Sequence, residues 1–158
     1  MSNVAGPPMQ MVLEEIDRDE CLRLLTTQSM GRLAVVDHGA YPPHIVPVNF
    51  ILEGDQVIFR SKFGLKFQLS VLAEHSVSFE ADLVDDRGHM AWSVVVQGRA
   101  QILTQGDIDA LPHGSWLYPW APGEHKEWVR IVPYTVTGRR VRPAPYSAEA
   151  AAEIETDE

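Results

Sequence analysis

The fold is indicated most clearly between residues 32 and 61, which read RLAVVDHGAYPPHIVPVNFILEGDQVIFRS. Three runs rich in Val, Ile and Phe lie in this stretch, at residues 33–36, 44–52 and 56–61. Short segments of turn-forming residues separate them, His38-Gly39 and Glu53-Gly54-Asp55, and such segments favour chain reversal between adjacent strands. The stretch therefore predicts an antiparallel meander of three strands.

More β-rich segments follow the meander. Residues 76–84 and 92–103 are rich in Val, Phe and Ile and are separated by the turn sequence DDRG at 85–88, which predicts a hairpin. Residues 127–142 predict a further strand pair, or one long strand bent around Pro133. Six or so strands with short connections predict a mainly β domain closed into a barrel.

Helices are expected to be few and short. Asp17 followed by Glu20 has the spacing of a capping box, and apolar residues continue at helical intervals until Gly31. Two shorter helical patterns occupy residues 64–72 and 104–111.

Length and composition fit a single soluble domain. The chain has 158 residues, of which 45% are hydrophobic and 22% charged. We assign residues 1–147 to one domain and residues 148–158 to an acidic, disordered tail. The single cysteine, Cys21, has no partner for a disulfide, which favours a cytoplasmic location. No apolar run reaches the roughly 20 residues that span a bilayer, which argues against membrane insertion.

Charge and motif content exclude several classes of function. The net charge is −9, and the only basic cluster is Arg139, Arg140 and Arg142, which argues against nucleic-acid binding. The six histidines lack the spacings of metal sites, so no metal is predicted. No G-x-S-x-G nucleophile motif occurs, and no catalytic residue is identified.

The most informative segment for chemistry is VIFRSKFGLK, residues 57–66. A strand ends there in Arg60-Ser61, and a loop through Gly64 leads to Lys66 at a predicted helix start. An arginine fork, a hydroxyl, an ammonium group and free helix N–H groups are the donors that a phosphate requires. The alternative is that Arg60 is an outward residue of an edge strand and Lys66 a solvated helix residue.

Two other segments could contact a flat ring. Asn49, in the segment Pro47-Val48-Asn49-Phe50, offers an amide donor and acceptor within an apolar strand. Trp92-Ser93 places an indole and a hydroxyl where another strand begins. The alternatives are a sheet-end role for Asn49 and a space-filling role for Trp92 at one end of the barrel.

Three blocks together resemble the pyridoxamine 5′-phosphate oxidase-like FMN-binding split-barrel family, with the resemblance running from about residue 19 to residue 140. The blocks are PVNF (47–50), VIFRS with GLK (57–61 and 64–66) and AWSVVVQG (91–98). Further similar segments are GRLA (31–34), FEAD (79–82), PWAPG (119–123) and VTGRR (136–140).

The resemblance implies a six-stranded antiparallel split barrel that forms a homodimer with FMN at the interface. It implies that Arg60, Ser61, Gly64 and Lys66 surround the phosphate and that Pro47, Val48 and Asn49 line the ring. Trp92 and Ser93 match a segment that approaches the flavin from the neighbouring strand pair. Two departures stand out: Ala91 replaces an expected glycine, and the substrate-phosphate arginines and histidine of true oxidases have no match.

The resemblance leaves three functional interpretations. The first is an FMN-dependent oxidoreductase of unknown small-molecule substrate and electron donor. The second is a non-catalytic module that binds FMN or a deazaflavin coenzyme for storage or sensing. The third is haem binding, which would require His44 or His125 as an axial ligand. Trp116, Tyr118 and Trp120 are expected either at a dimer interface or in the core.

Overall fold

A computed structural model of the chain describes residues 9–36, 42–61, 76–112, 117–120, 122–124 and 127–145. These residues form strands and short helices. In chain order they are β1 (Met11–Ile16), α1 (Arg18–Leu25), β2 (Met30–Val35), β3 (His44–Glu53), β4 (Gln56–Ser61), β5 (Ser76–Asp85), β6 (Met90–Ile102), α3 (Gln105–Asp109) and β7 (Glu127–Pro143).

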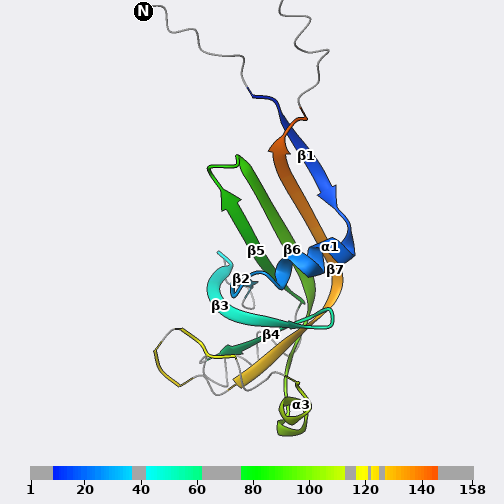
Figure 1. Cartoon of the computed structure of the whole chain (residues 1–158). Coiled ribbons are helices and arrows are strands. Elements are labelled where there is room, and N and C mark those ends of the chain that lie inside the picture. Colours follow the sequence, from blue (N-terminus) through cyan, green and yellow to red (C-terminus); the bar gives the residue numbers. More distant parts are fainter. Residues whose placement is uncertain are drawn as a thin grey trace, which may run out of the picture.

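Six of the strands close into an antiparallel barrel, as predicted. The sheet order is β1-β7-β4-β3-β2-β5-β6, and β6 also pairs with β7, so the ring closes and leaves β1 outside it. The ends of β5, β6 and β7, together with β1, extend beyond the ring as an arm (Figure 1). The predicted meander is β2, β3 and β4, and the predicted hairpin is β5 and β6.

β7 is one long strand rather than a strand pair. It runs along β6 for nearly its whole length, with a register shift between Gln97 and Gly98. Gly98 lies opposite Pro133, and a Cβ atom at Gly98 would approach the Val132 carbonyl oxygen to 2.2 Å. The missing Cβ lets the two backbones come close, and the irregularity falls beside a proline that has no N–H to donate.

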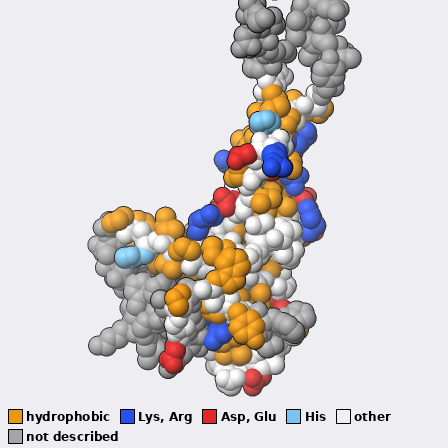
Figure 2. Space-filling model, turned by 60° about the vertical axis from the view of Figure 1, so that its left-hand side comes forward, with side chains coloured by type: hydrophobic (Ala, Val, Ile, Leu, Met, Phe, Trp, Pro, Cys, Tyr) orange, Lys and Arg blue, Asp and Glu red, His pale blue; other side chains and the backbone are white. Residues whose placement is uncertain are grey.

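The sequence analysis did not predict β1. Its residues pair with the C-terminal end of β7, from Met11 opposite Pro143 to Ile16 opposite Gly138. Ion pairs join Glu14 to Arg142 and, from α1, Glu20 to Arg140. Figure 2 shows charged side chains along this arm, above a body where hydrophobic side chains gather.

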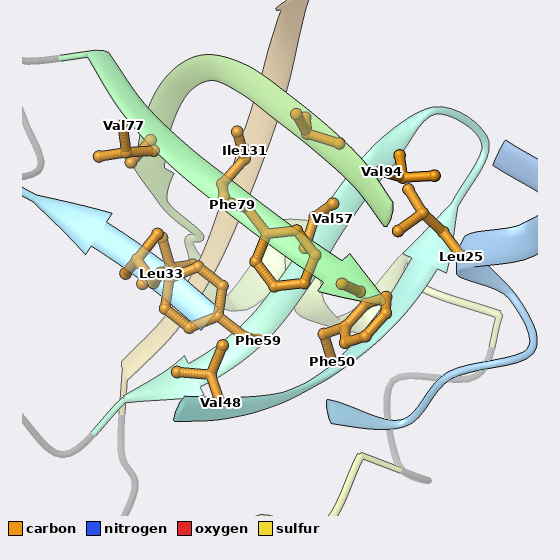
Figure 3. Close-up of a cluster of buried hydrophobic side chains, with 14 of the residues drawn as sticks. Leu25, Leu33, Val48, Phe50, Val57, Phe59, Val77, Phe79, Val94 and Ile131 are labelled. Atoms are coloured by element: carbon orange, nitrogen blue, oxygen red, sulfur yellow. The ribbon is translucent and has the colours of Figure 1, made fainter. Parts of the chain in front are cut away.

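The main core fills the barrel with inward-pointing side chains. Phe59 and Phe79 are fully buried, and the Phe79 ring packs edge-on against Phe50 with centroids 4.8 Å apart (Figure 3). Gly31 lies against the Phe79 ring, where a Cβ would come within 2.2 Å of it. The helix α1 begins at its cap Asp17, as predicted, and contributes Leu25 to the same core.

A second, smaller cluster covers the outer face of β4. Because side chains alternate along a strand, Ile58 points away from Phe59 and packs outside the barrel with Leu103 and Leu117. The predicted helix at 104–111 is α3, capped by Thr104 and packed here.

Several expectations concern residues outside the described ranges, namely the helix at 64–72 and the tail at 148–158. No helix in the described part of the chain is both long and apolar enough to cross a membrane.

Candidate functional site

Arg60 lies at the outer face of β4, one residue from the end of the strand. Its side chain is half-buried, and the guanidinium carbon lies 5.0 Å from the centroid of the Trp128 ring on β7. Nη1 donates a long hydrogen bond of 3.5 Å to the Leu117 carbonyl oxygen. Arg60 is therefore packed on the second cluster and is not a solvated edge residue. Because of these contacts, we expect that replacing Arg60 lowers the stability of the fold as well as the affinity for any ligand that Arg60 binds.

Ser61 ends β4 and points to the opposite side from Arg60. Its side chain is only 3% exposed, and among the described residues it is the one buried polar side chain. A buried hydroxyl beside a half-buried arginine places two hydrogen-bonding groups where the strand ends. Gly64 and Lys66, the other predicted phosphate residues, lie outside the described part of the chain.

Asn49 lies next to Arg60 on the neighbouring strand. Phe50 of β3 is opposite Phe59 of β4, so Asn49 and Arg60 are at the same level and on the same outer face. The Asn49 amide nitrogen donates to the Ser29 carbonyl at 3.1 Å, and its oxygen accepts the Trp120 N–H at 2.8 Å. Asn49 thus has a structural role of its own in addition to any contact with a ring.

The other two residues predicted beside the ring point in different directions. Pro47 is exposed on the outer face, as Asn49 is partly, whereas the Val48 side chain is buried in the main core. The Val48 side chain therefore faces away from the surface that carries Asn49 and Arg60.

The segment Leu117–Trp120 lies over this outer face and is held from both sides. Arg60 bonds to the carbonyl of Leu117 and Asn49 to the amide of Trp120. Leu117 is buried beneath, but the Tyr118 and Trp120 side chains are 70% and 68% exposed. These two aromatics are therefore not core residues, and Trp116 is outside the described part.

Trp92 and Ser93 lie on opposite faces of β6. Trp92 is only 6% exposed and belongs to the main core, so it fills the end of the barrel. Ser93 faces outward and lines a cleft. Along β7, Trp92 is opposite Arg140 and Arg60 is opposite Trp128, twelve residues away, which corresponds to as much as about 40 Å of strand. Within one chain, the two halves of the predicted site are far apart.

The cleft beside Ser93 was not predicted. It has a volume of about 510 Å³ and lies between β1, β6 and β7. The sequence offered one signal, the VTGRR segment, which carried the family resemblance without being given a role. The cleft is lined by Glu15, Ile16, Ser93, Val95, Gln97, Val136, Thr137, Gly138 and Arg139.

Glu20 of α1 forms ion pairs with Arg23 and Arg140. Hydrogen bonds from Arg23 and Arg140 lower the pKa of Glu20 from 4.5 to about 2. Burial raises the pKa of the Cys21 thiol, which disfavours the thiolate. These groups therefore support the fold and do not supply a reactive nucleophile.

Of the two histidines considered as axial haem ligands, the structure describes one. His44 begins β3 and is exposed, and His125 lies outside the described part. Among the described residues, no three His, Cys, Asp or Glu side chains are grouped so that they could hold a metal ion.

Comparison with known proteins decides the family. Residues 17–140 match the family model described as pyridoxamine 5′-phosphate oxidase. The chain belongs to this family. Its relative Rv0080 of Mycobacterium tuberculosis, an uncharacterized protein, is 35% identical over 144 residues, which cover 89% of this chain and 93% of the relative.

Solved structures of the family share the fold. A proposed pyridoxamine 5′-phosphate oxidase from Corynebacterium glutamicum is 36% identical with a TM-score of 0.67. An FAD-binding protein from Mycobacterium smegmatis is 29% identical with a TM-score of 0.60. Each match covers 82% of this chain and 98% of the other. The resemblance noted in the sequence and the six-stranded barrel are both confirmed.

Proposed function

We propose that this family member binds a flavin nucleotide, FMN, at the end of β4 and acts as an oxidoreductase. The observation that carries the proposal is the half-buried Arg60 near the end of β4, with Asn49 at the same level and on the same outer face of β3. The FAD-binding relative supports a flavin nucleotide as the class of ligand.

The residues present fit a phosphate-bearing, flat ligand. Arg60 is preorganised, because its guanidinium rests on Trp128. A planar guanidinium presents its N–H donors in a fork that matches a phosphate. Gly64 and Lys66 complete the proposed phosphate site. Asn49 holds the Trp120 backbone, and the exposed Trp120 side chain offers an aromatic surface near the ring site. When bound, a flavin supplies the electron-transfer chemistry, while the chain binds and orients it.

A homodimer is part of the proposal. Ser93 lies far from Arg60 along β7, so a second copy is needed if Ser93 and Arg60 are to contact one flavin. A two-fold pair is the commonest assembly. A light-scattering mass near 17.6 kDa, that of one chain, in the presence of FMN would contradict it. We also propose a cytoplasmic location, consistent with the single, buried Cys21.

Titration with FMN, FAD and riboflavin, followed by flavin fluorescence, tests the proposed site. We expect FMN to bind more tightly than riboflavin, which lacks the phosphate. Arg60→Ala should weaken FMN binding about 10- to 100-fold, since one charge-assisted contact contributes about 1.5–3 kcal/mol. Arg99→Ala, at an exposed arginine on β6, is the matched control and should bind as the wild type does. Equal affinity for FMN and riboflavin would contradict the proposed phosphate site.

Enzymatic activity is tested separately from binding. NADH or NADPH oxidation by the FMN-loaded protein under air would support an oxidoreductase. Tight flavin binding without turnover of either donor would favour the storage or sensing module. If a deazaflavin coenzyme added in the same kind of titration binds more tightly than FMN, the deazaflavin replaces FMN as the proposed cofactor.

A further inference from the structure

Trp128 lies directly opposite Arg60 where β7 pairs with β4. Both side chains are on the outer face of the barrel, and the guanidinium carbon of Arg60 is 5.0 Å from the centroid of the indole ring. A cation at that distance over an aromatic face is attracted by the quadrupole of the ring. The contact therefore acts on the side chain that is proposed to bind the phosphate.

The indole is held both by packing and through its backbone. Its ring is partly buried against the second cluster, whose buried members are Ile58, Leu103 and Leu117. The Trp128 carbonyl oxygen accepts a hydrogen bond of 2.8 Å from the Leu103 N–H. A side chain packed and anchored in this way offers a rigid surface to its neighbours.

The other arginine on this face of β7, Arg130, is held in a different way. Its Nε donates to the Gln101 side-chain oxygen at 2.9 Å, and its Nη2 lies 3.8 Å from the Asp107 carboxylate. Asp107 is fixed in turn by the capping box of α3, where hydrogen bonds from Thr104 lower the pKa of Asp107. Polar partners thus hold Arg130 toward β6 and α3, whereas the guanidinium of Arg60 rests on the indole.

We propose, on the basis of the proposed flavin site, that Trp128 is a positioning residue for phosphate recognition. The indole fixes the plane in which the Arg60 fork faces the phosphate, so Arg60 loses little side-chain freedom when the ligand binds. Trp128 acts through Arg60 and not through a contact with the flavin. It therefore strengthens the binding of FMN, which carries a phosphate, and leaves the binding of riboflavin unchanged.

Calorimetric titration of the full chain with FMN and with riboflavin separates this role from a general role in packing. Trp128→Leu keeps apolar bulk but removes the aromatic face. The ratio of riboflavin to FMN dissociation constants should then fall about 5- to 30-fold, the effect of losing a partly desolvated cation–π contact. Trp128→Phe keeps an aromatic face and should hold the ratio within about three-fold of the wild-type value.

Two further variants test whether Trp128 acts through Arg60. Ile108→Ala is the matched control for packing, because Ile108 of α3 packs against the same cluster. It should lower the free energy of unfolding, measured by urea denaturation, and leave the ratio unchanged. In an Arg60→Ala background, Trp128→Leu should have no further effect on the ratio, because the guanidinium through which it acts is gone.

The outcomes separate this inference from the flavin site on which it rests. If Arg60→Ala lowers the ratio and a folded Trp128→Leu does not, the phosphate site stands and the positioning role is wrong. Equal losses in Trp128→Leu and Trp128→Phe, or a further loss in the Arg60→Ala background, would also overturn it. If the wild type shows no preference for FMN over riboflavin, the flavin site fails, and the positioning role fails with it. Trp128→Met, a second apolar substitution without a ring, carries the same expectation if circular dichroism shows that Trp128→Leu is unfolded.

Discussion

The packing of α1 on β7 makes Gly138→Ala an informative perturbation. Gly138 is buried opposite Val94, and an added Cβ would lie 2.5 Å from the Cys21 sulfur. It would also lie 3.2 Å from the Ser93 carbonyl oxygen. Cys21 is a short, fully buried side chain, so relief requires the helix to move. Overpacking of this kind costs about 1–3 kcal/mol, which lowers the melting temperature by roughly 2–12 °C in a domain of this size.

A double-mutant cycle assigns that cost to the sulfur contact. Cys21→Ala removes the sulfur and by itself should cost on the order of 1 kcal/mol, as a small cavity does. The loss of unfolding free energy in the double variant Cys21→Ala with Gly138→Ala should be smaller than the sum of the losses in the two single variants, by about 0.5–3 kcal/mol.

Urea denaturation of the flavin-free protein measures all four variants. Gly106→Ala is the control, because a Cβ there meets nothing closer than 3.8 Å. Its stability should stay within about 1 kcal/mol of the wild type. A neutral Gly138→Ala, or strictly additive effects, would refute this account of how α1 packs on β7.

Further predictions concern the core, the Trp120 tether and pH. Phe59→Ala should lower the free energy of unfolding by about 3–5 kcal/mol, measured by urea denaturation, because the ring is fully buried. Asn49→Ala should lower it by about 1–3 kcal/mol by removing the bonds to Ser29 and Trp120, and no loss would argue against the tether. The folded-state pKa of Glu20 is depressed to about 2. Its ion pairs therefore contribute to the free energy of unfolding above pH 4.5, and this contribution is lost as the pH falls toward 2. The stability difference between wild type and Glu20→Gln should therefore shrink on acidification, and a constant difference would contradict a depressed pKa of Glu20 in the folded state.

The sequence predicted those parts of the fold whose signals are local. Turn residues and runs of β-forming side chains mark β2, β3 and β4, and the Asp17 cap marks the start of α1. β1 was missed because its partner lies at the far end of the chain, with Met11 opposite Pro143. Its side chains are at most half-buried, so no strong apolar pattern marks the strand.

The parts of the site that depend on neighbouring strands and on the alternation of side chains along a strand could be predicted from the sequence. Asn49 and Arg60 lie together because their strands are consecutive in the meander. The same alternation sends Val48 inward with Phe50, so its burial could have been deduced. The contact of Arg60 with Trp128 depends on β7, which follows β4 by more than sixty residues in the chain. No local sequence pattern predicts such a contact.

The phosphate preference tests the central claim most directly. The ratio of riboflavin to FMN dissociation constants is measured by calorimetry for wild type, Arg60→Ala and the control Arg99→Ala, with circular dichroism to confirm that each variant is folded. We predict a ratio well above one for wild type and Arg99→Ala, and a ratio reduced about 10- to 100-fold in Arg60→Ala. An unchanged ratio in a folded Arg60→Ala variant would show that Arg60 serves the packing of Trp128 and Leu117 alone, and would contradict a flavin phosphate site at the end of β4.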